Sequence, residues 1–410
     1  MNGTPIRYIS ARGLFWITQA ALVPFFAMVT FSLIHRNEAL PVRPKLNEYP
    51  RTVRPSHDYD FVITDSQLKR VLEKTRPKFS KQQPPKTNFV DHALRQWGVD
   101  AKFNDGSLSG RQMRQLLLNH ESFRAVWGAE QFPLLNDDEN GVEVTTQQGR
   151  STVSHEDHLL GTLAEVGTPL SFPIQTASRN AVVADLLMHA INTFRLNQRE
   201  YEWTILALAF YAADGESWYT NEKQQINFDR LAKRLMRQRQ PQGVCYGQHR
   251  LYTLIMMLRI NQQMQAKNGT GLLGDDSKKL VTEYLAGETR KLMQTQSTAG
   301  YWDGNWPNTK LAVPDPQTDE LSRRILATGH TLEWWAMAPS ELHPPRETIV
   351  RASQWLTKTI VEMDNNKTQK NYTFLTHAAR SLALWRGIFP GEFEQHRIAR
   401  RTRQTKQTNR

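Results

Sequence analysis

Five histidines occupy the same place in a short recurring sequence frame. In each copy the histidine is followed two residues later by Leu or Ala and five residues later by Leu or Trp. A neutral imidazole carries a free lone pair, which a metal ligand or a general base requires. The frame therefore predicts imidazoles held at equivalent positions, either for chemistry or because repeats share one packing problem. The copies are HALRQW from His92, HLLGTL from His158, HRLYTL from His249, HTLEWW from His330 and HAARSL from His377, with YEWTIL from Tyr201 as a sixth.

A carboxylate lies one helical turn after one of these histidines. Glu333 follows His330 on a mostly apolar segment, where a carboxylate is costly to bury unless it is paired or functional. We therefore expect Glu333, His330 and His249 to act as catalytic acid and base groups. The alternative is a structural salt bridge from Glu333 to Arg380 or Arg323.

The only cysteine of the chain lies four residues before one of the histidines. Cys245, His249 and His330 could bind one Zn²⁺, since thiolate and imidazole suit that metal, with His377 or Asp303 completing the set. A lone buried cysteine is also commonly inert. The expectation is therefore either a zinc site at Cys245, His249 and His330 or a chain without a cofactor.

Aromatic residues accompany the frame and could line a cavity. Tryptophans on these segments suit an apolar or sugar-binding cavity, and they are equally expected as packing in a helical core. The residues expected to contact a ligand are His158, His377, Tyr246, Trp203, Trp302 and Trp334.

The segments that carry the frame alternate with segments of a different kind. The frame copies are apolar on most faces, as buried helices are, whereas the intervening segments are amphipathic and richer in charge. Successive copies lie 43 to 81 residues apart, which indicates an array of two-helix units. The sequence thus predicts an all-α fold, an (α/α)6 toroid of six inner and six outer helices over 64–396, with an open solenoid as the alternative. The predicted outer helices are 65–76, 108–120, 179–197, 227–238, 275–296 and 346–363.

Two further expectations follow from this arrangement. The inner helices of a toroid run parallel, so histidines in their first turns would surround one mouth of it. The polar stretch 133–154, which alternates at Val142 and Val144, predicts a small hairpin-like flap inserted into the toroid.

One inter-helix motif resembles that of a known helical superfamily. Gln296, Gly300 and Trp302 match the Gln-x3-Gly-x-Trp loop of squalene-cyclase-type repeats. The chain from about 88 to 388 therefore resembles the terpenoid cyclase/protein prenyltransferase superfamily, which implies an α/α toroid. Terpene cyclisation is not implied, because the Asp-x-Asp-Asp acid motif of those cyclases is absent from the sequence.

Two shorter fragments resemble other toroid families. Val-Cys-Tyr-Gly at 244–247 is similar to the Trp-Cys-Tyr-Gly of lanthionine synthetase cyclases, whose cysteine binds zinc, although the Cys-His-Gly that completes that site is absent. Gly-His-Thr-Leu-Glu-Trp at 329–334 is similar to a motif of N-acylglucosamine 2-epimerase-type toroids, whose histidine helps to form the sugar site. Both resemblances imply a ligand cavity near the histidines.

The net charge of +12 is concentrated at the two ends of the chain. Residues 87–396 hold 32 Lys and Arg against 34 Asp and Glu, so we expect no nucleic-acid-binding face on the body. The apolar run 14–34 is long enough to cross a bilayer, and we expect a membrane anchor there, with a cleaved signal peptide as the alternative. The remaining boundaries are a tail at 1–13, a Pro- and charge-rich linker at 35–63 and a disordered basic tail at 397–410.

Together these features predict a single-pass membrane protein with an extracytoplasmic toroid body. Its His- and Trp-lined cavity is expected to bind a lipid-like or carbohydrate ligand and, if the protein is an enzyme, to process it. The alternative is a non-catalytic scaffold that uses the toroid for protein interactions at the membrane. An open cavity favours the first function and a filled interior favours the second.

Overall fold

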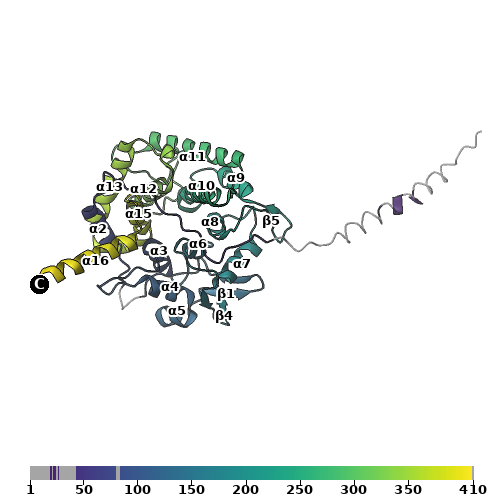
Figure 1. Cartoon of the computed structure of the whole chain (residues 1–410), viewed down its shortest axis with the longest axis horizontal. Coiled ribbons are helices and arrows are strands. Elements are labelled where there is room, and N and C mark those ends of the chain that lie inside the picture. The colour runs from purple at the N-terminus through teal and green to yellow at the C-terminus, as the bar shows by residue number, and fades with distance from the viewer. Residues whose placement is uncertain (1–18, 21, 25, 27–42, 80–83, 409–410) are drawn as a thin grey trace, which may run out of the picture. The chain divides into compact units, whose positions relative to one another are not determined.

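The computed structural model of the chain is mostly helical (Figure 1) and describes residues 19–20, 22–24, 26, 43–79 and 84–408. The chain divides into two compact units, Met1–Arg43 and Pro44–Arg410. All elements discussed below belong to the second unit.

Six helices, which we call the inner helices, contact one another in a cyclic order. α3 contacts α6, α6 contacts α8, α8 contacts α10, α10 contacts α12, α12 contacts α15, and α15 contacts α3. Their labels lie around the middle of the unit in Figure 1. The inner helices are α3 (Thr87–Trp97), α6 (His158–Glu165), α8 (Glu202–Tyr211), α10 (Gln248–Asn268), α12 (Glu320–Met337) and α15 (Tyr372–Leu384).

The inner helices are buried because apolar residues cover most of their faces. Every residue of α8 is buried, and so is every residue of α3 except Asn88. Glycine allows two of the helix pairs to approach closely. A Cβ atom on Gly161 of α6 would lie 2.6 Å from Trp203 of α8, and one on Gly329 of α12 would lie 3.0 Å from Ala378 of α15.

The remaining helices alternate with the inner ones along the chain. α4 contacts α3, α7 contacts α8, α9 and α11 contact α10, α13 contacts α12, and α2 contacts α15. Several begin at a residue whose side chain accepts a first-turn N–H, such as Thr64 before α2 and Asn227 before α9. Each of the six predicted outer ranges thus contains a helix, but two of the predictions are too long. Residues 180–182 of the predicted helix 179–197 form a strand, and the predicted helix 108–120 ends at Leu118. These and the other helices are α2 (Asp65–Lys74), α4 (Gly110–Leu118), α5 (His120–Trp127), α7 (Val183–Thr193), α9 (Phe228–Arg237), α11 (Asp275–Thr295), α13 (Arg346–Glu362), α14 (Asn365–Lys370) and α16 (Pro390–Thr408), with 3₁₀ turns at Val244–Gly247 and Ser340–Leu342.

Three short antiparallel hairpins interrupt the helices among the described residues. The predicted hairpin is confirmed as β1 (Leu135–Asp138) paired with β2 (Gly141–Val144). The other two, β3 (Pro173–Gln175) with β4 (Asn180–Val182) and β5 (Trp218–Tyr219) with β6 (Gln225–Ile226), were not predicted. Strands of two or three residues are too short to give a readable alternation.

Residues 44–63, expected to be part of a linker, pack against the helices instead. The Asn47 N–H donates to the Tyr211 carbonyl at 2.7 Å, and the Tyr59 N–H donates to the Trp385 carbonyl at 2.8 Å. The linker prediction is therefore wrong for this segment, which we call the strap. Its buried apolar side chains include Val53, Val62 and Ile63.

Two predictions about the chain ends are also corrected. Among the described residues, every helix is too short or too polar to span a bilayer, and this overturns the prediction of a single-pass membrane protein with an extracytoplasmic body. Most of the predicted span 14–34, like the tail 1–13, lies outside the described residues. The segment expected to be a disordered tail is helical to residue 408, as part of α16.

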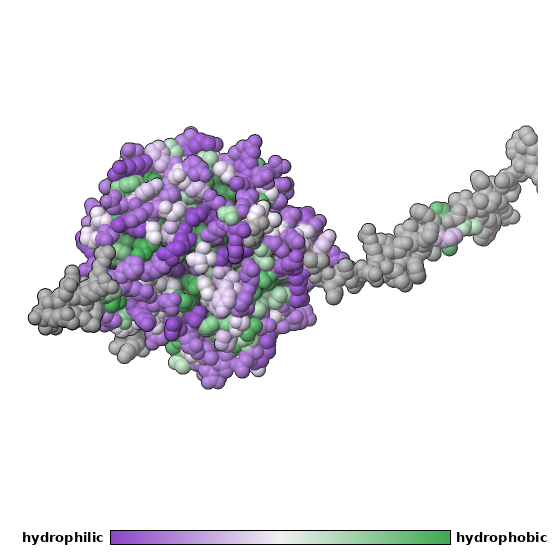
Figure 2. Space-filling model, in the orientation of Figure 1, coloured by the Kyte–Doolittle hydropathy of each residue, from purple (hydrophilic) through white to green (hydrophobic). Residues whose placement is uncertain are grey.

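The surface of the body is predominantly hydrophilic on the face shown in Figure 2, where the hydrophobic areas are small and separate. Exposed apolar residues that occur singly are normal for a folded domain. The features of interest lie inside.

Candidate functional site

One aromatic ring from each inner helix contributes to a closed cycle of six side chains, which we call the histidine ring. The successive centroid distances are 4.2 Å for His92–His158, 4.2 Å for His158–Trp203, 4.4 Å for Trp203–His249, 4.6 Å for His249–His330, 4.0 Å for His330–His377 and 5.1 Å for His377–His92. The predicted proximity of His249, His330 and His377 is therefore confirmed.

The histidines do not all lie at helix starts. His158 and His249 are in the first turns of α6 and α10, as expected, whereas His330 lies in the second half of α12. The side chain of Asp319 caps α12 eleven residues before His330. Gly329, directly before His330, lies inside α12 where this helix packs closely on α15.

Hydrogen bonds fix the ring nitrogens of several histidines. Nδ1 of His92 lies 2.8 Å from the Asn88 carbonyl, and Nδ1 of His330 lies 2.8 Å from the Leu326 carbonyl. Because a carbonyl only accepts, both Nδ1 atoms carry the hydrogen and both Nε2 atoms carry a lone pair in the neutral rings. Nε2 of His330 lies 3.1 Å from Nε2 of His249, so His249 donates in this contact.

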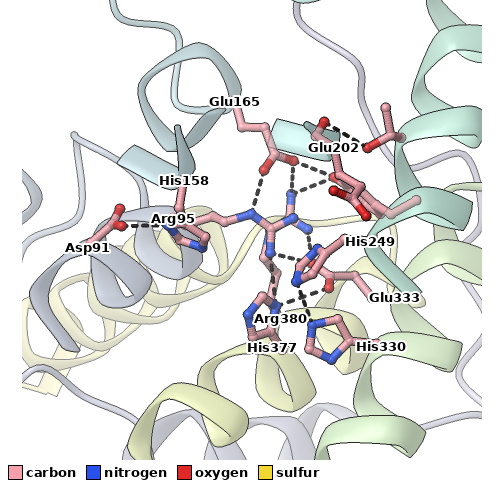
Figure 3. A network of polar contacts seen from close by, with 12 residues as sticks. Asp91, Arg95, His158, Glu165, Glu202, His249, His330, Glu333, His377 and Arg380 are labelled. Atoms are coloured by element: carbon pink, nitrogen blue, oxygen red, sulfur yellow. Dashed lines mark hydrogen bonds and ion pairs between the residues drawn. The ribbon is translucent and has the colours of Figure 1, made fainter. Parts of the chain in front are cut away.

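A buried carboxylate orients the histidine of α6. Nδ1 of His158 lies 2.5 Å from Oδ2 of Asp91, and Figure 3 shows this pair beside the rest of the network. Burial raises the pKa of Asp91 to about 6. Burial also lowers the pKa of His158 well below its usual value, so the neutral imidazole donates to the aspartate.

All five ring histidines are neutral at physiological pH. Burial lowers the pKa of His330 to about 4. Burial, and then the neighbouring imidazoles, lower the pKa values of His92, His249 and His377 well below the ordinary value. The ring therefore presents lone pairs and N–H groups rather than positive charge.

One turn beyond the histidine ring lies a buried set of charged side chains, which we call the ionic layer. Nε of Arg95 lies 2.5 Å from Oε2 of Glu165, and Nη1 of Arg95 lies 2.8 Å from Oε1 of Glu333. Nη2 of Arg380 lies 2.9 Å from Oε1 of Glu165, and its Nη1 donates to Glu333. The Tyr252 hydroxyl donates to Glu165. Figure 3 shows how the two arginines lie between the two glutamates.

Glu333, the expected catalytic acid, belongs to this layer. It pairs with Arg380, which is one of the two alternatives that the sequence left open, while Arg323 bonds to Asp303 at 2.9 Å. Burial alone would raise the pKa of Glu333, but Arg95 and Arg380 outweigh it and lower that pKa below its usual value. The carboxylate is therefore ionised at neutral pH, and donation of a proton by Glu333 is disfavoured.

A cavity of about 450 Å³ lies over one side of the histidine ring. His92, His377 and Cys245 are among its lining residues. Cationic side chains surround it, and among the described residues that line it there is no carboxylate. These cationic residues are Lys86, Arg150 and Lys370.

Most residues expected to contact a ligand lie in the core instead. Trp302 Nε1 donates to the Leu292 carbonyl at 2.9 Å, and Trp334 Nε1 donates to Gln248 Oε1 at 3.1 Å. The Tyr246 ring packs against Gly304 and is 6% exposed.

The structure separates the candidate residues into two groups by their access to the cavity. His377 lines it, as does Cys245. His158, Trp203, His249 and His330 are buried in the ring beneath it, and Glu333 lies in the ionic layer. Catalysis by His249, His330 and Glu333 acting directly on a ligand in this cavity is therefore not favoured by their positions.

Three groups of side chains within the described residues could hold a metal ion, each with ligand atoms within 4.8 Å of one another. One is the predicted group Cys245, His249 and His330. Burial raises the pKa of the Cys245 thiol, so without a metal the thiol keeps its proton. The other groups are His92, His158 and His377, and His330, Glu333 and His377.

The ionic layer is the part of the network that sequence reasoning missed. Arg95, Tyr252, Glu333 and Arg380 each follow a frame histidine by three residues. Residues three apart lie on the same face of a helix. The ionic layer could therefore have been predicted from the fourth position of the frame, where charged residues of opposite sign recur on helices expected to be buried.

The chain was also compared with models of protein families, with curated protein sequences and with solved structures, and none of these comparisons gives a match.

Proposed function

We propose that the helical body is an (α/α)6 toroid with the architecture of the terpenoid cyclase/protein prenyltransferase superfamily. The cyclic contacts of the six inner helices support this, because an open solenoid would leave its first and last inner helices apart. The contribution of one ring per inner helix to the histidine ring supports it independently.

In this toroid, the cavity over the histidine ring binds a small anionic ligand, such as a carbohydrate that carries a carboxylate or phosphate group. The observation that carries this proposal is the charge of the lining, with Lys86, Arg150 and Lys370 around a floor that includes His92 and His377. The cationic side chains donate charge-assisted hydrogen bonds to anionic oxygens. A volume of about 450 Å³ suits a small molecule.

If the protein processes this ligand, His92 and His377 are the groups placed to take part. Both line the cavity, so their rings can contact a bound molecule. Burial lowers their pKa values, which keeps the rings neutral and disfavours transfer of a proton to them. The Cys245 thiol lies at the same cavity, and burial raises its pKa, which disfavours a reactive thiolate.

Calorimetric titration of the purified full chain tests the proposal. Glucuronate and glucose 6-phosphate should bind with a stoichiometry of one, whereas glucose and a fatty acid should bind at least about tenfold more weakly. The Lys86→Gln/Arg150→Gln double variant should lose about tenfold or more in affinity for the anions, since each removed charge contributes on the order of 1 kcal/mol. Lys279→Gln, on the exposed face of α11, is the matched control.

Equal affinity for glucose and its phosphate would contradict the anionic specificity. Anion binding that persists unchanged in the double variant would contradict the assignment to this cavity. Tighter binding of the fatty acid would favour a lipid-like ligand instead.

A non-catalytic scaffold remains the second candidate, and the ionic layer favours it. Arg95, Glu165 and Arg380 separate the cavity from another one of about 360 Å³, whose lining includes these three residues. The interior is thus filled by paired charges rather than open along its length. Absence of binding by every anion tested would favour the scaffold.

A further inference from the structure

Three histidines of the histidine ring form a second potential metal site, apart from the one that contains the cysteine. His92, His158 and His377 come from α3, α6 and α15, and each offers a ligand atom within 4.8 Å of the other two. In a tetrahedral zinc site, nitrogens at about 2.0–2.1 Å from the metal lie about 3.3 Å apart. A small inward movement of these side chains would therefore complete such a site.

The outer nitrogen of two of these imidazoles already has a partner of the kind found behind metal ligands. Nδ1 of His92 donates to the Asn88 carbonyl at 2.8 Å, and Nδ1 of His158 donates to Asp91 at 2.5 Å. Metal-bound histidines almost always donate their second N–H to a carbonyl or a carboxylate. In both residues Nε2 is left with its lone pair.

His377 can adopt the same arrangement. Its Nδ1 lies 3.2 Å from Oε2 of Glu333 and 3.0 Å from Nη1 of Arg95. In the contact with Arg95, Nδ1 of His377 accepts, because a guanidinium only donates. When Nη1 of Arg95 bonds to Glu333 alone, Nδ1 of His377 can carry the hydrogen and donate to Glu333, which leaves the lone pair on Nε2. Nη1 of Arg95 keeps an acceptor in this tautomer, because it also lies 2.8 Å from Oε1 of Glu333.

Unpaired nitrogens provide the independent observation. Nε2 of His158 and Nε2 of His377 are buried and have no hydrogen-bond partner among the described residues. His158 is fully buried and His377 is 2% exposed. A buried polar atom without a partner costs about 1–3 kcal/mol, and a bound ion is one of the groups that remove this cost.

We propose that His92, His158 and His377 bind one Zn²⁺ ion at the floor of the cavity. Three neutral imidazoles suit this metal and leave a fourth tetrahedral position open. That position faces the cavity, since His92 and His377 line it. Binding releases no proton from the Nδ1–H tautomers. The metal site stands without a ligand in the cavity; only the further step, in which an anion occupies the fourth position, rests on the proposed function.

Metal titration of the chelator-treated full chain tests this site. Zn²⁺, measured in competition with a chromophoric chelator, should bind with a stoichiometry of one. His158→Gln and His92→Gln should each weaken binding more than about 100-fold, because even an outer partner of a ligand contributes 10- to 100-fold. Asp91→Asn, which keeps an acceptor for His158, should weaken it by about tenfold. Circular dichroism identifies any variant that does not fold. If one histidine variant is unfolded, the zinc affinity of the other histidine variant tests the site.

Cys245→Ser is the matched control, because it belongs to the rival metal group and leaves all three histidines intact. It should keep Zn²⁺ affinity within about threefold, and Co²⁺ in the wild-type chain should show no sulfur-to-cobalt charge-transfer band. A sulfur-to-cobalt band that Cys245→Ser abolishes would overturn the proposal in favour of Cys245, His249 and His330. No Zn²⁺ binding would also overturn it.

The two proposals fail separately. The Lys86→Gln/Arg150→Gln double variant should keep the zinc affinity while it loses the anion, since neither cation is a ligand. Loss of zinc binding with retained anion binding in His158→Gln would support the metal site and the cavity together. Zinc binding that is unchanged in both histidine variants would overturn the metal site alone.

Discussion

Replacement of Glu165 by glutamine should reveal how strongly the ionic layer holds the fold. The Glu165 side chain is 4% exposed and its partners Arg95 and Arg380 are 1% and 5% exposed. The layer contains two arginines and two glutamates, so it is neutral, and the variant leaves one buried positive charge uncompensated. Breaking a buried pair in this way costs about 3–5 kcal/mol.

Urea unfolding at pH 7.5, followed by circular dichroism, measures this loss. The matched control is Glu288→Gln. Glu288 is also buried, at 3%, but its partner Lys291 is 50% exposed, and water replaces the lost contact. The control should therefore lose no more than about 1 kcal/mol. The larger loss in Glu165→Gln should persist in 1 M NaCl, because salt screens buried charges much less than exposed ones.

The pH dependence of the same difference has a defined sign. Burial would raise the pKa of Glu165, but Arg95 and Arg380 outweigh it and lower that pKa below its usual value. The carboxylate therefore contributes stability that is fully present above the unfolded pKa and is lost as the pH falls through the folded pKa. The gap between wild type and Glu165→Gln should narrow below about pH 4.5. Equal losses in the Glu165 and Glu288 variants at pH 7.5 would refute the reasoning.

Two further variants test the packing. Gly161→Ala should lower the free energy of unfolding in urea by about 1–3 kcal/mol, because the new methyl group would lie 2.6 Å from Trp203. Gly287→Ala should raise it by up to about 1 kcal/mol, because its methyl group would meet only the end of one arginine side chain. The reverse order would contradict the close approach of α6 and α8. A chain that begins at residue 64 should have a free energy of unfolding lower by on the order of 5 kcal/mol than one that begins at residue 44, because it lacks three buried apolar side chains of the strap. Equal thermal stability of the two chains would show that the strap contributes little to the fold.

The sequence was sufficient to place most of the inner and outer helices and to predict that the histidines gather, but not for α5, α14 or α16. The outer helices could be predicted because one apolar stripe and a capping residue are local signals, as at Thr64 and Asn227. The prediction that His330 lies in the first turn of its helix was wrong, because α12 already begins at Glu320. Gly329 inside this helix allows close contact with Ala378, a residue distant in the sequence.

The arrangement around the histidines depended on contacts that a single sequence does not contain. The expected burial of Glu333 required a cationic partner, and the sequence offered Arg380 and Arg323. Its second partner, Arg95, could not be predicted because it lies 238 residues away in the sequence. The strap was mistaken for a linker because Pro and charged residues dominate its composition. Only a few of its side chains are apolar and buried against the helices. The cavity lining joins residues from α3, the 147–155 loop and α15, and no periodicity links these segments.

The contact between α3 and α15 has a consequence for synthesis of the protein. Arg95 of α3 and His377 of α15, whose Nη1 and Nδ1 atoms lie 3.0 Å apart, are separated by 282 residues of sequence. At 5–20 residues per second, a ribosome needs on the order of 15–60 s to make the chain between them. During that time the nascent chain displays apolar inner helices whose last neighbour does not yet exist. We therefore expect the closed contact of the inner helices to form only after the C-terminal residues are made, and we expect the unfinished chain to expose apolar helix faces of the kind that chaperones bind.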